Sequence, residues 1–218
     1  MIVLGLTGSI GMGKTTAAVT LRRLGVPLFD ADRLVHRLLA AGGAAVEPVA
    51  ASFAGVRAAK GGIDRALLGQ RVFGDPLALS RLERILHPIV EACEKRFVNF
   101  ARARREPIVV LDIPLLFESR SERRCDYVIV VSAPRLVQQQ RVMRRPGMTQ
   151  GRLAAILRNQ MPDHEKRRRA DFVVPTGLNR RVSLRRLRAT LTLLRTEKSM
   201  ITRQSRCPYR ERRRRADA

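Results

Sequence analysis

The first thirty residues constrain this chain more than any other segment. Residues 2–7 are an apolar run with β-branched side chains, which predicts a buried strand. Residues 8–15 read G-x-x-x-x-G-K-T, and residues 15–24 carry apolar side chains at helical spacing until Gly25. Residues 26–29 predict a second short strand that ends at Asp30. A strand, a glycine loop, a helix and a strand in this order predict a βαβ unit of a parallel sheet.

The glycine loop matches the pattern of a phosphate-binding loop, or P-loop. Gly8, Gly11 and Gly13 permit a bend that turns backbone N–H groups toward an anion, and the following helix adds its positive N-terminal dipole. Lys14 is predicted to reach the terminal phosphates of a nucleotide, and the Thr15 hydroxyl is predicted to bind Mg²⁺. The alternative is a merely glycine-rich turn, but the preceding strand and the following helix favour phosphate binding.

Three aspartates follow predicted strands. Asp30 and Asp32 come after the second strand, and Asp112 ends a third predicted strand at residues 108–111. Since ligands gather at the carboxyl ends of strands in an open parallel sheet, these carboxylates are expected to face the P-loop. Asp32 is the candidate catalytic base, although Asp30 or Asp32 can instead cap the next helix and Asp112 can instead open a turn. The sequence leaves open which of the three contacts Mg²⁺, directly or through water.

The remaining chain alternates between helical and strand patterns. Residues 31–105 have helical spacing with breaks at glycines, and this stretch is too long for a simple connection, so it predicts an inserted helical subdomain. Beyond it, strands are predicted at 127–131 and 172–174, and helices at 135–144, 149–161 and 182–194. Residues 196–218 are expected to form a disordered basic tail.

Basic residues are in large excess over acidic ones. The chain has 43 Lys and Arg against 19 Asp and Glu, a net charge of +24, which predicts a polyanionic ligand, either a nucleotide or a nucleic acid. Aromatic residues make up 4% of the chain and Trp is absent from the sequence, which argues against base stacking. Nucleic acid is therefore expected only as nonspecific binding through the basic tail.

A cluster of arginines follows the fourth predicted strand. Arg141, Arg144 and Arg145 are predicted to share one helical face before the break at Pro146, which suits a mobile lid that closes over a triphosphate. A solvated basic face is the alternative there, and it is the preferred interpretation of the basic run at residues 166–169.

Several classes of protein are disfavoured. No apolar run approaches the ~18 residues of a membrane span, and the N-terminal segment lacks the basic leader of a secretory signal. Cys93, Cys125 and Cys207 are too few and too scattered for a disulfide framework or a zinc site. We therefore expect a cytoplasmic protein that does not enter a membrane, and the sequence does not predict its oligomeric state.

Taken in order, several stretches of residues 1–195 resemble the dephospho-CoA kinase family. Asp30-Ala31-Asp32 and the Pro-Leu-Leu-Phe-Glu stretch at 114–118 separate this family from other P-loop kinases better than the P-loop does. The other matching stretches are 6–16, Ile63-Asp64-Arg65, Val72-Phe73, Leu86-His87-Pro88, Gln140-Arg141, Gln160 and Ala170-Asp171-Phe172-Val173.

The resemblance implies both a fold and a reaction. The fold is α/β, a three-layer P-loop fold with a five-stranded parallel sheet, an inserted helical substrate-binding subdomain within residues 60–105, and a lid at residues 142–165. The reaction is transfer of the γ-phosphate of ATP to the ribose 3′-hydroxyl of dephospho-CoA, which yields CoA and ADP in the last step of coenzyme A biosynthesis. The alternatives are another P-loop metabolite or nucleoside kinase, or a P-loop protein that binds nucleic acid.

The resemblance also implies roles for individual residues. Asp32 acts as base or as orienter of the acceptor, Thr15 holds Mg²⁺, and Arg141 and Arg145 neutralise charge. Arg65 and His87 lie on the dephospho-CoA side. The groups that bind the ATP phosphates are Gly8, Gly11, Met12, Gly13, Lys14, Thr15 and Thr16.

Overall fold

All five strands lie parallel in one sheet, in the spatial order β2-β3-β1-β4-β5. The computed structural model describes residues 1–72 and 74–201. The predicted five-stranded parallel sheet is confirmed, with strand ends displaced by two residues at most. The strands are β1 (Ile2–Thr7), β2 (Leu28–Asp30), β3 (Ile108–Asp112), β4 (Tyr127–Ser132) and β5 (Phe172–Pro175).

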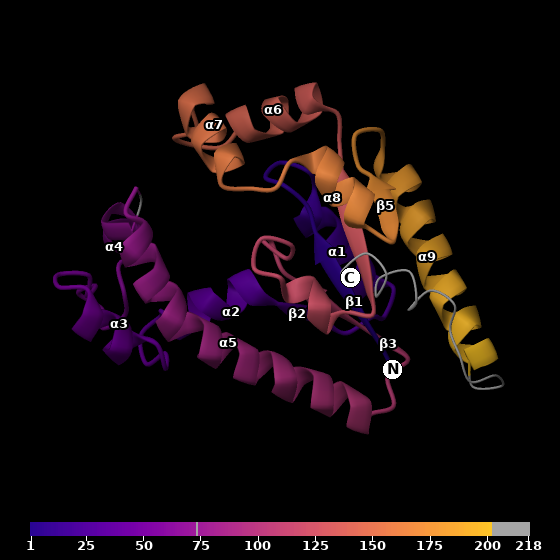
Figure 1. Cartoon of the computed structure of the whole chain (residues 1–218), viewed down its shortest axis with the longest axis horizontal. Coiled ribbons are helices and arrows are strands. Elements are labelled where there is room, and N and C mark those ends of the chain that lie inside the picture. The colour runs from indigo at the N-terminus through magenta and orange to yellow at the C-terminus, as the bar shows by residue number, and fades with distance from the viewer. Residues whose placement is uncertain (73, 202–218) are drawn as a thin grey trace, which may run out of the picture.

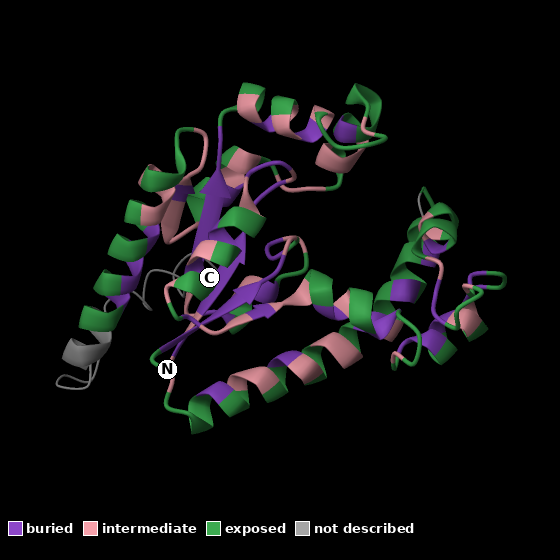
Figure 2. Ribbon diagram, turned by 180° about the vertical axis from the view of Figure 1, so that it is seen from behind, coloured by how far each residue is buried: buried purple, intermediate pink, exposed green. Residues whose placement is uncertain are grey.

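Helices cover both faces of the sheet, as the three-layer prediction requires. Successive strand residues point to opposite faces, so the strands contribute to two separate cores. On one face, Val110 and Ile129 pack with α1 (Lys14–Arg23) and α9 (Arg180–Ile201). On the other face, Leu111 and Val128 pack with the helices that follow β2. Figure 2 shows the buried sheet between these more exposed helical layers.

The stretch at residues 31–105 is helical, as its residue spacing predicted. Its helices are α2 (Ala31–Leu38), α3 (Val46–Ser52), α4 (Arg65–Val72) and α5 (Pro76–Ala103). The helices begin directly after β2, at Ala31, and the assignment of the part within residues 60–105 to substrate binding stays a prediction. Figure 1 shows α3 and α4 at the end of α5 that lies away from the sheet, and α5 contacts α2, α3 and α4. The long α5 thus positions the outer part of the insertion.

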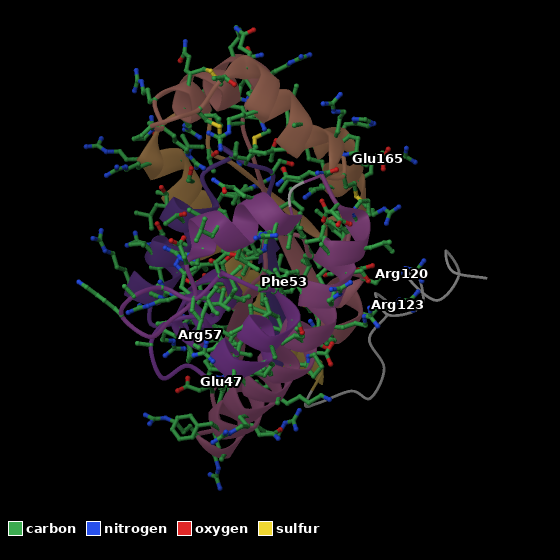
Figure 3. All side chains as sticks on the ribbon, turned by 90° about the vertical axis from the view of Figure 1, so that its left-hand side faces the viewer. Glu47, Phe53, Arg57, Arg120, Arg123 and Glu165 are labelled. Atoms are coloured by element: carbon green, nitrogen blue, oxygen red, sulfur yellow. The ribbon has the colours of Figure 1, made fainter. Side chains whose placement is uncertain are left out.

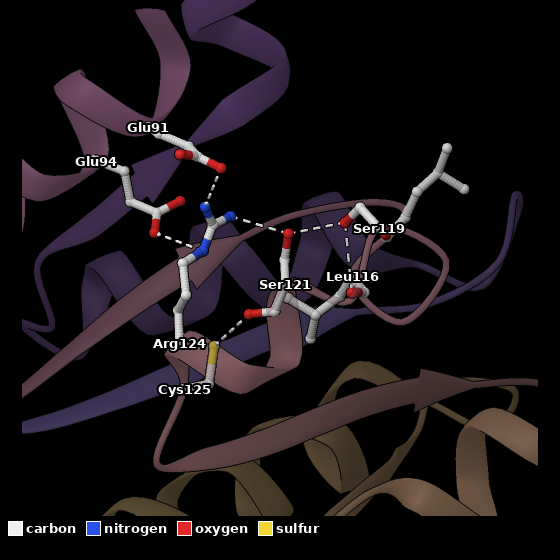
Figure 4. Close-up of polar contacts among 8 residues, drawn as sticks. Glu91, Glu94, Leu116, Ser119, Ser121, Arg124 and Cys125 are labelled. Carbon is white, nitrogen blue, oxygen red and sulfur yellow. Dashed lines mark hydrogen bonds and ion pairs between the residues drawn. The ribbon is translucent and has the colours of Figure 1, made fainter. Parts of the chain in front are cut away.

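A polar cluster attaches α5 to the segment before β4 (Figure 4). Arg124 ends the short 3-10 helix η1 (Ser121–Arg124) and forms ion pairs with Glu91 at 3.0 Å and Glu94 at 3.2 Å. Its guanidinium also donates to Ser121 Oγ at 2.9 Å. Burial raises the pKa of Glu94, and the charge of Arg124 opposes this rise.

Local contacts hold the outer part of the insertion. Arg57 forms an exposed ion pair with Glu47 (Figure 3), and a single antiparallel bridge joins Arg57 to Ile63. Exposed ion pairs contribute little to stability. Burial of Val49 and Phe53 in the core beneath α5 therefore holds this region more strongly than the charges do.

The C-terminal half places a helical hairpin beyond the carboxyl end of the sheet. Its helices are α6 (Arg135–Met143) and α7 (Gln150–Arg158), and they extend outward in Figure 1. The following α8 (Asp163–Arg169), which was not predicted, packs against β4. The last helix, α9, continues to Ile201, so residues 196–201 are helical and do not belong to a tail. The rest of the predicted disordered tail, residues 202–218, lies outside the described residues.

The long helices α5 and α9 interleave arginines with apolar residues. Among residues 1–72 and 74–201, no helix is both long enough and apolar enough to cross a membrane.

Candidate active site

The P-loop joins β1 to α1 and bends at glycines. Gly11 and Gly13 have φ of 76° and 86°, in the left-handed region that other residues avoid. The first helical hydrogen bond runs from the Ala17 N–H to the Gly13 carbonyl at 3.2 Å, so the N–H groups of residues 13–16 have no helical acceptor. In the described range Lys14–Arg23, no acidic residue lies in the first turn and no side chain caps it. This helix start therefore offers backbone donors and a positive potential to an anion.

Three further residues of the predicted phosphate site differ in burial. Thr15 and Thr16 lie exposed in the first turn of α1. Met12 is 3% exposed, and its Sδ accepts a hydrogen bond from the Ala133 N–H at 3.1 Å. The hydroxyl of Thr15 is thus accessible to a ligand, whereas the side chain of Met12 packs beneath the loop.

Lys14 lies between two of the predicted carboxylates. Asp112 ends β3 and is paired in register with Leu6 of β1, so the sheet itself brings this carboxylate to the loop. Lys14 Nζ is 2.7 Å from Asp112 Oδ1 and 3.7 Å from Asp32 Oδ2. The Asp112 side chain is 5% exposed, whereas that of Asp32 is 63% exposed. One carboxylate is therefore a buried partner of the lysine, and the other faces solvent, where a substrate can approach.

The buried position of Asp112 changes its proton affinity. Removal from water raises the pKa of Asp112, and the Lys14 ammonium opposes the rise by its charge and its hydrogen bond. The carboxylates of Asp30 and Asp32 raise it further. The charge state of Asp112 is consequently sensitive to any ligand that moves Lys14.

Asp30 caps a helix, which is one of the alternatives that the sequence allowed. Its Oδ1 accepts from the Arg33 N–H at 2.9 Å as the N-cap of α2, and its Oδ2 lies 3.3 Å from Arg22 Nη2. Asp32 lies in the first turn of the same helix and is the carboxylate that approaches Lys14. The two aspartates therefore do different work, with Asp30 occupied by the backbone of α2.

Arg65 contacts the helix that carries Asp32. Arg65 begins α4, and its Nη1 lies 2.5 Å from Nε2 of His36. His36 is four residues after Asp32 on α2, and residues four apart share a helical face. His87 is exposed on α5 beside Pro88. Arg65 is thus linked to the Asp32 helix, whereas a role for His87 stays a prediction.

Arg141 is bound to the P-loop and to the turn after β5. Its Nη1 donates to the Gly11 carbonyl at 3.4 Å, and its Nη2 donates to the Thr176 carbonyl at 2.6 Å. The prediction that Arg141 and Arg145 share a helical face is wrong, because α6 ends at Met143 and Arg145 lies exposed in the following turn. Pro146 explains this end, since a residue before proline disfavours the helical conformation.

An ion pair that the sequence did not reveal lies beneath the segment after α7. Lys166, predicted to be on a solvated face, is fully buried, and its Nζ lies 2.8 Å from Glu118 Oε1. The same oxygen accepts from the Met161 N–H at 2.8 Å. Two acidic residues in the first turn of α8, Asp163 and Glu165, are the helix-start signal by which this helix could have been found. A run of four basic residues conceals which of them the helix turns inward, and this is why the prediction failed at Lys166.

The oxygen donors at the loop fit a magnesium ion. Mg²⁺ prefers oxygen ligands and is held in kinases by one or two protein groups together with phosphate oxygens. Thr15 is the second residue of α1 and follows Lys14, whose ammonium contacts the carboxylates of Asp32 and Asp112. In the described part of the chain, no group of three or more His, Cys, Asp or Glu could hold a metal ion unaided. The donor set therefore suits an ion that is shared with a bound nucleotide.

A parallel sheet with a P-loop after its first strand, and a lysine of that loop between the carboxylates of Asp32 and Asp112, define a P-loop phosphotransferase. The family model described as dephospho-CoA kinase matches residues 2–179. A relative from Rhodospirillum rubrum, named dephospho-CoA kinase, is 55% identical over 195 residues, which cover 89% of this chain and 92% of the relative. The chain belongs to the dephospho-CoA kinase family, as its resemblance implied.

Solved structures support the same fold. A crystal structure of a Thermus thermophilus protein has a TM-score of 0.75 at 38% identity, and the match covers 88% of this chain and 97% of that one. Dephospho-CoA kinase from Campylobacter jejuni has a TM-score of 0.61 at 22% identity, with 88% and 96% covered. At the lower identity the likeness shows the shared fold alone.

Proposed function

We propose that Lys14, Asp32 and Asp112 form the centre at which this chain transfers the γ-phosphate of ATP to the 3′-hydroxyl of dephospho-CoA. As a family member, the chain is a kinase of the last step of coenzyme A biosynthesis. The observation that carries the residue assignment is the position of Lys14 Nζ, 2.7 Å from Asp112 and 3.7 Å from Asp32 at the start of α1. Backbone N–H groups that can bind phosphate, the Lys14 ammonium and the solvent-facing carboxylate of Asp32 therefore occupy one site.

The P-loop binds the phosphates of ATP in this proposal. The N–H groups of residues 13–16 and the dipole of α1 attract the β- and γ-phosphates. Lys14 belongs to the P-loop, so its ammonium can bind a phosphate oxygen in place of part of its contact with Asp112. Thr15 and Asp112 would hold Mg²⁺, which when bound neutralises phosphate charge.

Asp32 acts on the acceptor alcohol. Its exposed carboxylate accepts the proton of the 3′-hydroxyl, or orients that hydroxyl, as the oxygen attacks the γ-phosphorus. The bond from that phosphorus to the bridging oxygen of ADP breaks, so the products are CoA and ADP. The neighbouring Lys14 ammonium stabilises the negative charge that develops on the transferring group.

Two helical parts complete the proposed site. The part of the insertion within residues 60–105 receives dephospho-CoA, with Arg65 and His87 on the substrate side, and the contact of Arg65 with His36 on the Asp32 helix supports this placement. The segment 142–165 serves as a lid, with Arg141 and Arg145 supplying positive charge toward the triphosphate. The substrates in this proposal are the small molecules ATP and dephospho-CoA, and the reaction takes place in the cytoplasm.

A coupled ADP-release assay with dephospho-CoA as acceptor tests the proposal. We expect Lys14→Ala to lower kcat/KM by about 10²–10³-fold, as the loss of a phosphate-stabilising group does elsewhere, and Asp32→Asn to lower kcat by about 10²–10⁴-fold. Lys95→Ala, an exposed lysine on α5, is the matched control and should keep full activity. Strong turnover with another alcohol and none with dephospho-CoA would contradict the substrate assignment.

A further inference from the structure

We infer that Gln138 and Gln160 are positioning residues that hold the P-loop at Ile10 and attach it to both ends of the α6–α7 hairpin. This inference rests on the proposed role of the P-loop in binding ATP. Gln138 Nε2 donates to the Ile10 carbonyl at 2.8 Å, and the Ile10 N–H donates to Gln160 Oε1 at 3.1 Å. One residue of the loop is therefore bound by a side chain that precedes the hairpin turn and by another that follows α7.

The backbone of Ile10 depends on these two side chains. Ile10 lies in a turn, outside any strand or helix, so no regular secondary structure pairs its N–H and carbonyl groups. Partly buried backbone groups need partners, and an unmade hydrogen bond costs more than a made one contributes. Gln138 is 5% exposed, so water replaces its amide poorly. The side chain at position 138 must donate a hydrogen bond and the side chain at position 160 must accept one. Substitutions can therefore test the two glutamines separately.

The two following carbonyls of the loop are bound in a similar way. Arg141 Nη1 donates to the Gly11 carbonyl at 3.4 Å, and Thr176 Oγ1 donates to the Met12 carbonyl at 2.6 Å. Side chains thus bind three successive carbonyls, at residues 10, 11 and 12. This arrangement maintains the bend that leaves N–H groups at the start of α1 available to phosphate.

The end of the hairpin at Gln160 is itself anchored. The next residue, Met161, donates its N–H to Glu118 Oε1, the oxygen that is paired with Lys166. Glu118 belongs to the loop that follows β3, the strand that carries Asp112. At the other end, Gln138 is buried within α6. Both glutamines therefore bind Ile10 from anchored positions at the two ends of the hairpin.

Methionine substitutions remove the amides at similar side-chain volume. We expect Gln138→Met and Gln160→Met each to raise the KM for ATP about 10-fold, equivalent to about 1.4 kcal/mol, with a much smaller change in the KM for dephospho-CoA. Hydrogen exchange of the peptide covering residues 8–16 should become faster in Gln160→Met, because the Ile10 N–H loses its acceptor. Gln140→Met, at an exposed glutamine of the same helix, is the control and should match the parent protein.

Glutamate substitutions separate positioning from packing. Glutamate at 160 still accepts from Ile10, whereas glutamate at 138 lacks the donor and sets a carboxylate against a carbonyl. Gln160→Glu should therefore keep slow exchange at residues 8–16 and a KM for ATP within about 3-fold of the parent, and Gln138→Glu should lose both. Equal behaviour of the two glutamate variants, or an unchanged KM for ATP in both methionine variants, would overturn the inference.

Two further outcomes also test the inference about the glutamines. If a variant at position 138 fails to fold, the comparison of Gln160→Met with Gln160→Glu settles the question at Gln160, and equal exchange rates there reject the inference. An inactive Lys14→Ala together with normal glutamine variants rejects only this inference. A fully active Lys14→Ala rejects the proposed function of the site instead.

Discussion

The buried pair of Lys166 and Glu118 predicts an unequal cost for the loss of its two members. The Nζ–Oε1 distance is 2.8 Å, and the side chains are 0% and 18% exposed. At an effective dielectric constant of about 20, the attraction at this distance is about 6 kcal/mol, but desolvation costs several kcal/mol for each ion. The intact pair therefore has a small net effect, and the cost of breaking it depends on which charge stays behind.

Glu118→Gln leaves the Lys166 ammonium without a counter-charge in a site that water does not reach. An uncompensated buried charge costs about 3–5 kcal/mol, which for a protein of this size lowers the melting temperature by about 6–20 °C. Lys166→Met leaves a carboxylate that is partly exposed and still accepts from Met161, so we expect a smaller cost of about 1–3 kcal/mol. The double variant E118Q/K166M carries no charge at this buried position and should be more stable than Glu118→Gln.

Urea and thermal unfolding of the parent, the two single variants and the double variant measure the coupling. Arg167→Met, at the exposed neighbour of Lys166 on α8, is the control and should leave the free energy of unfolding unchanged. The reasoning is refuted if the two single variants lose equal stability, or if the double variant loses the sum of both.

Further predictions concern Asp112, two glycines and the cap of α2. Burial raises the pKa of Asp112, so kcat/KM should fall on the acid side at a higher pH than an ordinary aspartate would cause, and Asp112→Asn should remove this limb of the pH profile. Because the folded-state pKa lies above the unfolded one, ionisation of Asp112 lowers stability as the pH rises between these values, and the variant should lose that slope in unfolding measurements. Gly8→Ala would place a Cβ 2.4 Å from Val131 Cγ2 and 2.8 Å from the Val131 carbonyl oxygen, and should cost about 1–3 kcal/mol in thermal unfolding. Gly69→Ala on α4, where a Cβ meets no described atom within 4 Å, should instead stabilise by up to about 1 kcal/mol. Asp30→Ala removes the cap of α2 and should cost about 1 kcal/mol in urea unfolding, which Asp30→Ser should largely restore; no difference between these two variants would argue against the cap.

The layout of the sheet and the centre of the site were predictable from local patterns. Both faces of a parallel sheet are buried, so its strands appear in the sequence as short apolar runs between turns. Carboxyl ends of parallel strands meet at one edge, and for this reason Asp112 could be expected beside Lys14 before the ion pair at 2.7 Å was seen. The cap of α2 was predictable as one of two roles for Asp30 or Asp32, because a helix start must satisfy its own N–H groups.

Contacts between distant segments were not predictable in this way. Gln138 is 128 positions from Ile10, and Glu118 is 43 positions from Met161. A glutamine that binds the P-loop has the same local sequence pattern as one that faces solvent, and Lys166 stands in a run of four basic residues.

Residue order alone therefore determined the strand–loop–helix unit, the backbone donors and the chemistry of the groups nearest to them, since these depend on neighbours along the chain. The burial of Lys166, the attachment of Arg141 and the support of the loop by two glutamines were decided only by the packing of α8 against β4 and by the position of the α6–α7 hairpin beside the P-loop. Such contacts depend on which surfaces meet in three dimensions, and a local sequence pattern does not specify contacts between distant segments.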